Sequence, residues 1–279
     1  MYGLTVYTDE ELKKIQSLEL DALKEIIRIC NTCNIEYFLV DGAAIGAVRH
    51  HGFIPWDDDI DVGMTRDNYR KFLEAAPSLL STQYFLQTPY DNKKSPYFYT
   101  KLRINGTQFV EYSNRKLDIN HGVYVDICPY DEVPDDERLN EQQYRKCQAL
   151  IHLFVWRQSP SMSKPPENKI QEIKALFRIL GHYALKIIPY RCIANAIEQE
   201  TTKYDETGQS ALSFLHYPKR NIDYIKKSEL YPLRTCDFEG IKVKIPNDFD
   251  AYLTRHYGNY LKLPPENGRY GHKPYYIRI

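Results

Sequence analysis

The chain has 279 residues, and its 37 lysines and arginines balance its 37 aspartates and glutamates. A chain of this length can bury one large core, and a net charge of zero gives no general attraction to nucleic acid. No apolar run is long enough to span a membrane, and none follows a basic start as in a secretory leader, so we expect a soluble protein made in the cytoplasm.

Six cysteines are spread along the chain without the spacing of a secreted disulfide framework. Cys30 and Cys33 form one Cys-x-x-Cys pair, which could be half of a zinc or redox site. A second pair is missing, and this pair closes a predicted helix instead of opening one after a strand. We therefore expect plain thiols.

The first predicted elements are a helix, a strand and a second helix. Thr8 and Glu11 have the spacing of a capping box, and apolar residues then recur at helical spacing as far as Cys30. This long helix should lie across a sheet. Residues 36–41 are predicted to form the first core strand, and residues 42–50 a short helix above the site.

The most informative stretch is residues 40–64, VDGAAIGAVRHHGFIPWDDDIDVGM. Its last part has the pattern of a strand in which Asp59 and Asp61 flank Ile60, so the two carboxylates point to the same side while Ile60 turns into the core. Two such carboxylates repel each other unless a cation lies between them. Hard oxygen ligands of this kind suit Mg²⁺ or Mn²⁺.

The glycine turn before this strand indicates phosphate chemistry. Gly42 and Ala43 open a helix whose free N–H groups can receive a phosphate. Arg49, near the end of that helix, can meet donor phosphates or can instead compensate the helix C-terminus. Asp57 and Asp58 are expected to cap or orient. An Asp-x-Asp pair alone is more often solvated, but beside a phosphate-binding turn it favours phosphoryl or nucleotidyl transfer.

Two later segments carry charges inside strand-like runs. Residues 97–104 and 107–111 are joined by an Asn-Gly pair, which predicts a β-hairpin. Lys101 and Arg103 share one face of its first strand, which is either a solvated outer face or part of the site. Asp126 lies inside an apolar strand, where an unpaired charge would be costly.

The chain changes character after residue 134. Asp131, just before that point, is expected to lie in a loop and to be structural. A Ser/Pro-rich connector interrupts a helical region, which is followed by a last β portion and a helix. We expect helices over residues 135–156, 170–187 and 189–207, the connector over 158–169, strands over 212–216, 233–238 and 241–245, and a last helix over 248–257.

The string GAVRHHGFIPWDDDIDVGM closely resembles the LicD family of phosphocholine transferases, relatives of fukutin and fukutin-related protein. The residues before and within this string, Gly42-Ala43-Ala44 after an apolar strand, a short linker and then Asp-Ile-Asp, have the order of the nucleotidyltransferase fold, in which a neighbouring strand supplies a third carboxylate, here Asp126. The end of the chain shares the family's ending. The matching motifs are Phe238-Glu239-Gly240, Pro246, Tyr252-Leu253, Tyr257-Gly258 and Leu263-Pro264-Pro265.

The resemblance implies an α+β protein with a nucleotidyltransferase-fold core, a mixed twisted β-sheet with packed helices. Residues 1–133 would form the catalytic core, residues 134–209 a helical insertion on the acceptor side, and residues 210–279 a hairpin and helix that pack back on the core.

The activity implied is metal-dependent transfer of phosphocholine from CDP-choline to a sugar hydroxyl of a cell-surface glycan, such as a lipopolysaccharide or teichoic-acid precursor, with release of CMP. Asp59, Asp61 and Asp126 would bind Mg²⁺ or Mn²⁺, and Asp126 could also accept the proton of the acceptor. The residues expected to bind substrate are Gly42, Ala43, Arg49, Trp56, Lys101 and Arg103.

Several alternatives stay open at this point. The donor could be another CDP-alcohol carrying glycerol phosphate, ribitol phosphate or phosphoethanolamine, or the enzyme could transfer a nucleotide from a nucleoside triphosphate; a binding subunit without catalysis is a third reading. An aromatic cage beside the site would favour choline, and the 24 tyrosines offer rings for one or merely pack. A lipid-linked acceptor would require peripheral contact with the inner membrane face. No role is assigned to His50, His51 or His272.

Overall fold

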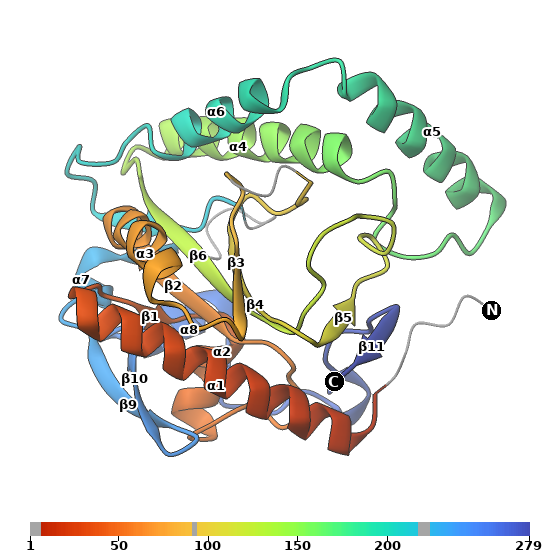
Figure 1. Cartoon of the computed structure of the whole chain (residues 1–279). Coiled ribbons are helices and arrows are strands. Elements are labelled where there is room, and N and C mark those ends of the chain that lie inside the picture. Colours follow the sequence, from red (N-terminus) through yellow and green to blue (C-terminus); the bar gives the residue numbers. More distant parts are fainter. Residues whose placement is uncertain (1–6, 91–93, 217–223) are drawn as a thin grey trace.

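The computed structural model describes residues 7–90, 94–216 and 224–279, and a mixed sheet lies at its centre (Figure 1). The strand order is β1-β2-β6-β4-β3. The long central strand β6 (Tyr124–Val133) runs parallel to β2 (Asp61–Thr65) and antiparallel to β4 (Thr100–Ile104). The outer strands β1 (Phe38–Leu39) and β3 (Tyr84–Gln87) pair antiparallel with β2 and β4.

Helix α1 (Asp9–Cys33) begins at the predicted capping box. The Thr8 hydroxyl accepts a hydrogen bond from the Glu11 amide at 3.2 Å, and the Glu11 carboxylate accepts one from the Thr8 amide at 2.7 Å. The apolar side of α1 is buried against α3 (Arg66–Leu79) and β6. The long helix therefore lies across the sheet, as its spacing predicted.

Helix α2 (Asp41–Arg49) follows β1 after one residue. The predicted strand over residues 36–41 is shorter than expected because the helix already begins at Asp41, whose φ of 48° turns the chain sharply. The amide of Val40 donates to the carbonyl of Asp61 at 3.1 Å. The start of α2 is thereby fixed beside the first residue of β2.

The predicted hairpin across the Asn-Gly turn is wrong. Strand β5 (Gln108–Val110) pairs with β11 (Tyr276–Arg278), near the end of the chain. Strand β4 has β3 on one edge and β6 on the other, so it has no free edge for β5. The turn at Asn105-Gly106 still forms, but the strand that follows it, β5, pairs with the C-terminal strand β11.

Three helices follow the sheet and lie together on one side of the molecule (Figure 1). They are α4 (Glu137–Gln158), α5 (Lys169–Leu185) and α6 (Tyr190–Thr201), close to the predicted ranges. Their buried apolar side chains form small clusters apart from the main core, for example Phe98 with Phe154 and Ile197. The division of the chain after residues 133 and 209 stays a prediction.

The last part of the chain returns to the sheet. Strands β7 (Ala211–Ser213) and β8 (Tyr224–Lys226) extend the end of β6, and the short helix α7 (Lys227–Leu230) follows. The predicted turn at Glu239-Gly240 joins β9 (Arg234–Phe238) to β10 (Ile241–Ile245), and α8 (Phe249–Tyr257) and a short 3₁₀ helix η1 (Glu266–Gly268) complete the fold. This hairpin contacts β1 and α2, and α8 contacts α2.

All six cysteines are free thiols, as predicted. Cys30 is fully buried, and burial raises the pKa of its thiol to about 12. A thiol that stays protonated at neutral pH is a weak nucleophile and a poor metal ligand. Cys30 therefore belongs to the core.

A buried ion pair joins helix α3 to the central strand. The guanidinium of Arg66 binds both carboxylate oxygens of Asp131 at 2.6 and 2.7 Å, and the Asp131 side chain has no exposed surface. Asp131 is structural, as expected, although it lies within β6 and not in a loop. The pair fixes α3 against the strand that carries Asp126.

Replacing Arg66 with methionine should destabilise the protein by about 3–5 kcal/mol, because the buried charge of Asp131 loses its partner. The double variant Arg66→Met, Asp131→Leu should recover most of this loss, because no uncompensated charge remains. Urea unfolding of the three proteins measures both effects. A double variant as unstable as the single one would show that the ion pair is not the cause.

Candidate active site

The parallel pairing of β2 and β6 brings two of the predicted metal ligands together. Asp61 and Asp126 are direct neighbours in the register of these strands. Asp59 precedes Asp61 by two residues, and Ile60 between them is fully buried while both aspartates keep some exposure. The alternation predicted from the sequence is present, although β2 itself begins only at Asp61.

Asp126 has a basic partner from the next strand. Lys101 lies opposite Asp126 in the pairing of β4 with β6, and its Nζ atom is 2.6 and 2.9 Å from the two carboxylate oxygens. Three aromatic rings surround this ammonium, with centroids 3.5 Å (Tyr124), 4.4 Å (Tyr97) and 5.2 Å (Tyr99) away. Lys101 thus neutralises Asp126 inside a box of tyrosines.

A solvated outer face, one of the two readings for Lys101 and Arg103, is ruled out. Their exposed fractions are 1% and 2%. The guanidinium of Arg103 donates to the Gln87 side chain at 2.8 Å and to the Gly122 carbonyl at 2.9 Å. Arg103 therefore ties neighbouring strands together, and the structure provides no solvent-facing path from it to a donor.

More carboxylates converge on this place than the sequence suggested. Burial, and next the charge of Asp59, raises the pKa of Asp57 to about 8. Burial raises the pKa of Asp41 to about 7, and burial together with the charges of Asp59 and Asp41 raises that of Asp61 well above its usual range. A bound cation would relieve the repulsion between such carboxylates.

Glu19 of α1 adds another acid to this cluster. Its side chain is 1% exposed, and one of its carboxylate oxygens has no hydrogen-bond partner among the described residues. Burial, followed by the charges of Asp59, Asp58, Asp57 and Asp126, raises its pKa well above normal. In the sequence, Glu19 is an acid at a position of the helix where the spacing calls for an apolar residue, and that mismatch is a signal of function.

Among the described residues, one group of three side chains offers ligand atoms within 4.8 Å of one another: Asp58, Asp59 and His272. Asp58, however, already accepts hydrogen bonds from the Tyr7 hydroxyl (2.7 Å), the His272 amide (2.9 Å) and His272 Nδ1 (3.0 Å). Burial would raise the pKa of Asp58, but His272 lowers it, and the hydrogen bond to Asp58 raises the pKa of His272 to about 10. This pair is best understood as an ion pair that anchors the C-terminal segment.

The carboxylate oxygens of the predicted trio Asp59, Asp61 and Asp126 do not all lie within 4.8 Å of one another. One reason is visible in the structure, since Lys101 holds both oxygens of Asp126. The chemistry of the cluster nevertheless fits a divalent cation, because hard, mutually repelling carboxylates bind such ions well. The role of the trio as metal ligands stays a prediction.

The predicted phosphate-binding turn lies against the acidic loop. A Cβ atom at Gly42 would be 2.5 Å from Asp57 Oδ2, so any larger residue there would force the Asp57 side chain to move. Ala43 is buried in the first turn of α2. The position of both residues at a helix N-terminus fits anion binding, which stays a prediction.

Arg49 and Trp56 lie on either side of His50. Arg49 Nε donates to His50 Nε2 at 2.9 Å, its Nη1 donates to the Tyr260 carbonyl, and the rings of His50 and Trp56 are 6.4 Å apart in an edge-on arrangement. The half-buried Arg49 is not paired with a carboxylate among the described residues. This leaves its charge available for a donor phosphate.

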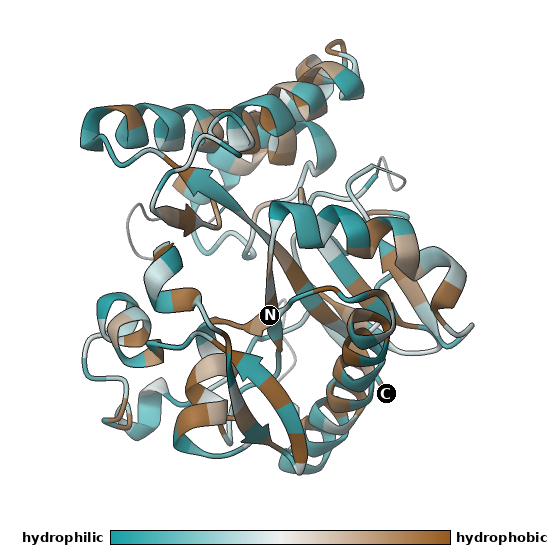
Figure 2. Ribbon diagram, turned by 90° about the vertical axis from the view of Figure 1, so that its left-hand side faces the viewer, coloured by the Kyte–Doolittle hydropathy of each residue, from teal (hydrophilic) through white to brown (hydrophobic). Residues whose placement is uncertain are grey.

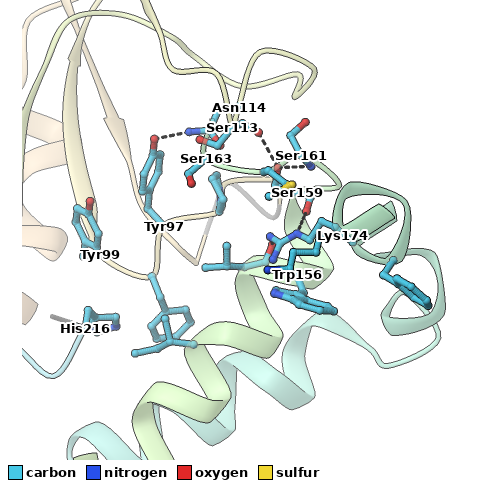
Figure 3. Close-up of a pocket in the computed structure, with 17 residues that line it drawn as sticks. Tyr97, Tyr99, Ser113, Asn114, Trp156, Ser159, Ser161, Ser163, Lys174 and His216 are labelled. Carbon is cyan, nitrogen blue, oxygen red and sulfur yellow. Dashed lines mark hydrogen bonds between the residues drawn. The ribbon is translucent and has the colours of Figure 1, made fainter. Parts of the chain in front are cut away.

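A cavity of about 680 Å³ lies between the segment leading into β4 and helices α4 and α5 (Figure 3). Aromatic rings from these three elements line it, including Tyr97, Tyr99, Trp156 and Phe177. Tyr97 and Tyr99 also surround Lys101, so the cavity begins next to the Lys101–Asp126 pair. This cavity has no direct signal in the sequence, because its lining comes from several segments spread between Pro96 and His216.

Residues 34–153 match a family model described as LicD/FKTN/FKRP, nucleotidyltransferase domain. Over 271 residues the chain is 30% identical to the lipopolysaccharide cholinephosphotransferase LicD of Haemophilus influenzae, and the alignment covers 96% of each chain. The chain belongs to the LicD family. Shorter similarities link it to uncharacterized proteins of Rickettsia typhi (31% identity over 83 residues, 28% of this chain and 27% of the other) and Rickettsia prowazekii (36% over 67 residues, 22% and 25%).

Membership of the LicD family confirms the predicted fold class. The mixed sheet, with Asp59, Asp61 and Asp126 on or beside adjacent strands, is the core of a nucleotidyltransferase domain. The LicD-family match of residues 34–153 spans β1 to most of α4 and contains all three of these aspartates.

Replacing Gly271 with alanine should detach the C-terminal segment from Asp58. A Cβ atom there would lie 2.5 Å from Asp58 Oδ1 and closer still to the Tyr7 hydroxyl, and both groups are held by hydrogen bonds. We expect a loss of about 1–3 kcal/mol in stability and faster amide exchange over residues 269–279. Urea unfolding and hydrogen–deuterium exchange mass spectrometry measure these effects.

The matched control for this experiment is Gly268→Ala, because the atom nearest to an added Cβ there is 3.8 Å away. This variant should behave as the wild type. If both glycine variants changed exchange over residues 269–279 to the same extent, the anchoring role of Asp58 would be disproved.

Proposed function

We propose that this LicD-family protein transfers phosphocholine from CDP-choline to a sugar hydroxyl of a cell-surface glycan precursor and releases CMP. The observation that carries the proposal is the pairing of Asp61 with Asp126 on adjacent strands, two residues after Asp59 and beside the start of α2. Identity of 30% across 96% of a lipopolysaccharide cholinephosphotransferase supports the choice of donor and of a lipopolysaccharide-type acceptor.

Asp59, Asp61 and Asp126 would hold Mg²⁺ or Mn²⁺. Such an ion supplies charge neutralisation on the transferring phosphate and the leaving CMP, and it lowers the pKa of the acceptor hydroxyl. Burial is the main cause of the raised pKa of Asp59 and of Asp61, and the charges of neighbouring carboxylates raise both further. A cation fits this place because it would offset both effects. Lys101 orients Asp126 through its two short contacts.

The reaction is an in-line displacement at the phosphorus atom that bears choline. The acceptor oxygen forms a bond to phosphorus, the bond from phosphorus to the CMP oxygen breaks, and Asp126 is the candidate to take the acceptor proton. Gly42 and Ala43 at the start of α2, with Arg49, would bind the donor phosphates. Positioning and charge stabilisation therefore do most of the catalysis.

The aromatic cavity favours choline over a polyol as the transferred alcohol. Tyr97, Tyr99 and Trp156 line the cavity, and they offer a quaternary ammonium group ring surface beyond the parts that Lys101 and Arg178 already contact. Trp56, half-buried beside His50 at the other side of the acidic loop, is a candidate to contact the nucleotide. Arg103 is left out of the donor site because it is buried and hydrogen-bonded within the sheet.

The acceptor in this proposal is a glycan precursor carried on a membrane lipid, and the enzyme reaches it at the inner face of the membrane. Among the described residues, no helix combines the length and apolar character that crossing a bilayer requires. Contact with the membrane would therefore be peripheral in this part of the chain. A role for nucleic acid is not proposed.

Incubation with CDP-choline, CDP-glycerol, CDP-ribitol, CDP-ethanolamine and nucleoside triphosphates tests the proposal directly. We expect Mg²⁺-dependent release of CMP, fastest from CDP-choline, in the presence of a lipopolysaccharide-type acceptor. Faster turnover of another CDP-alcohol would show that a different alcohol is transferred, while the proposed type of reaction would stay the same. Pyrophosphate release from a triphosphate would instead make the protein a nucleotidyltransferase, and no turnover of any donor would favour a binding subunit.

The variant Asp59→Asn should lower CMP release by about 10²–10³-fold, because it removes one metal-binding charge from the site. Its melting temperature should not fall, because the substitution also relieves repulsion among buried carboxylates. Asp118→Asn is the control, since that side chain is 89% exposed. CMP release by the Asp59 variant at the rate of this control would remove Asp59 from the mechanism.

A further inference from the structure

Large apolar side chains are exposed on the helical part of the protein far more than elsewhere. Of the nineteen large hydrophobic side chains that are exposed among the described residues, eleven lie between Leu153 and Ile188. These are Leu153, Trp156, Ile170, Ile173, Leu176, Phe177, Ile179, Leu180, Tyr183, Ile187 and Ile188. Patches of this kind mark binding surfaces in soluble domains.

Helix α5 carries most of this surface, and it does so on the side that faces away from the protein. His182 is its single buried residue, and Nδ1 of His182 is 3.1 Å from the Trp156 carbonyl of α4. The exposed residues Ile173, Leu176 and Leu180 recur every three or four positions, on the opposite side of the helix. A surface helix normally presents its polar side to water, so this orientation indicates that something apolar covers it.

The same surface is basic. Residues 153–191 contain seven lysines and arginines but two glutamates, a net charge of +5, so the rest of the chain carries −5. Lys174 and Lys186 lie on either side of the apolar residues of α5 and are exposed. Arg115 and Lys116 add to this charge, because they line a smaller cavity with Ile179 and Tyr183 of α5.

We propose that the outer face of α5 docks on the surface of an anionic lipid bilayer. An apolar helix face with lysines at its edges can bury its side chains at the level of the headgroups while the ammonium groups contact lipid phosphates. A second copy of the chain is a poor occupant, because pairing α5 with itself would bring two segments of charge +5 together. The helices at the top of Figure 2 carry brown, hydrophobic segments between teal ones.

Docking through α5 would also place the aromatic cavity near the membrane. Lys174, Phe177 and Arg178 of α5 line that cavity, and Figure 3 shows Lys174 on the side opposite Tyr97 and Tyr99. A lipid-linked glycan could then reach the cavity without leaving the bilayer. This consequence rests on the proposed function, whereas docking itself is measured without donor or acceptor, so each can fail separately.

Co-sedimentation with vesicles tests the docking. The full-length protein should bind vesicles of phosphatidylglycerol and phosphatidylcholine, with affinity at least about tenfold lower for pure phosphatidylcholine or at high salt. The variant Leu176→Glu, Leu180→Glu should lower binding to the anionic vesicles by at least about tenfold. Both leucines are 56% exposed, so the fold should persist, as circular dichroism and thermal unfolding would verify.

The matched control is Leu261→Glu, Leu263→Glu, because these leucines are also exposed (59% and 44%) but lie outside the helical part. It should bind vesicles as the wild type does. A second variant, Lys169→Glu with Lys186→Glu, should lose binding to anionic vesicles through charge alone. Absence of wild-type binding, or equal binding by the α5 leucine variant and its control, would overturn the proposal. So would a wild-type dimer that the α5 leucine variant converts to a monomer, measured by sedimentation velocity.

Discussion

The placement of Asp61 beside Asp126 on two parallel strands is the constraint on which the site depends. Two carboxylates at neighbouring positions of a sheet repel each other, and burial strengthens that repulsion. Lys101 compensates the charge of Asp126, because its ammonium group contacts both carboxylate oxygens of Asp126 and is surrounded by tyrosine rings. Asp59 lies 3.9 Å from His272 Nδ1, and among the described residues neither Asp59 nor Asp61 has two short contacts to a lysine as Asp126 has.

The rest of the architecture supports this arrangement from both ends of the chain. Helix α1 brings the buried Glu19 to the cluster, and the C-terminal segment brings His272 to Asp58. Strand β11 pairs with β5 and so holds the end of the chain near the site. The acidic cluster is therefore assembled from the beginning, the middle and the end of the sequence.

Much of the site was accessible to sequence reasoning because its signals are local. The alternation of Asp59, Ile60 and Asp61 depends only on the geometry of an extended chain, and the exposures agree with it. The start of α2 and the capping box of α1 are likewise set by neighbouring residues. The Asn-Gly hairpin failed because a turn signal specifies a bend, while strand partners depend on which sheet edges are free. The substrate-binding role of Lys101 stays a prediction, and its ion pair with Asp126 depends on strand register, which one sequence does not specify.

The sequence by itself determined the family, the order of most helices and strands, and the acids of the Asp59–Asp61 motif, because these follow from short-range periodicity and from a distinctive string of residues. Tertiary structure alone decided that Glu19 and His272 join the acidic cluster, that Arg103 is buried, and that α5 turns its apolar face outward. The net charge of the whole chain is zero, and this total does not show that residues 153–191 are basic while the rest of the chain is acidic. The physical reason is that burial and electrostatic coupling depend on distances between residues far apart in the chain, and these distances exist only once the chain has folded.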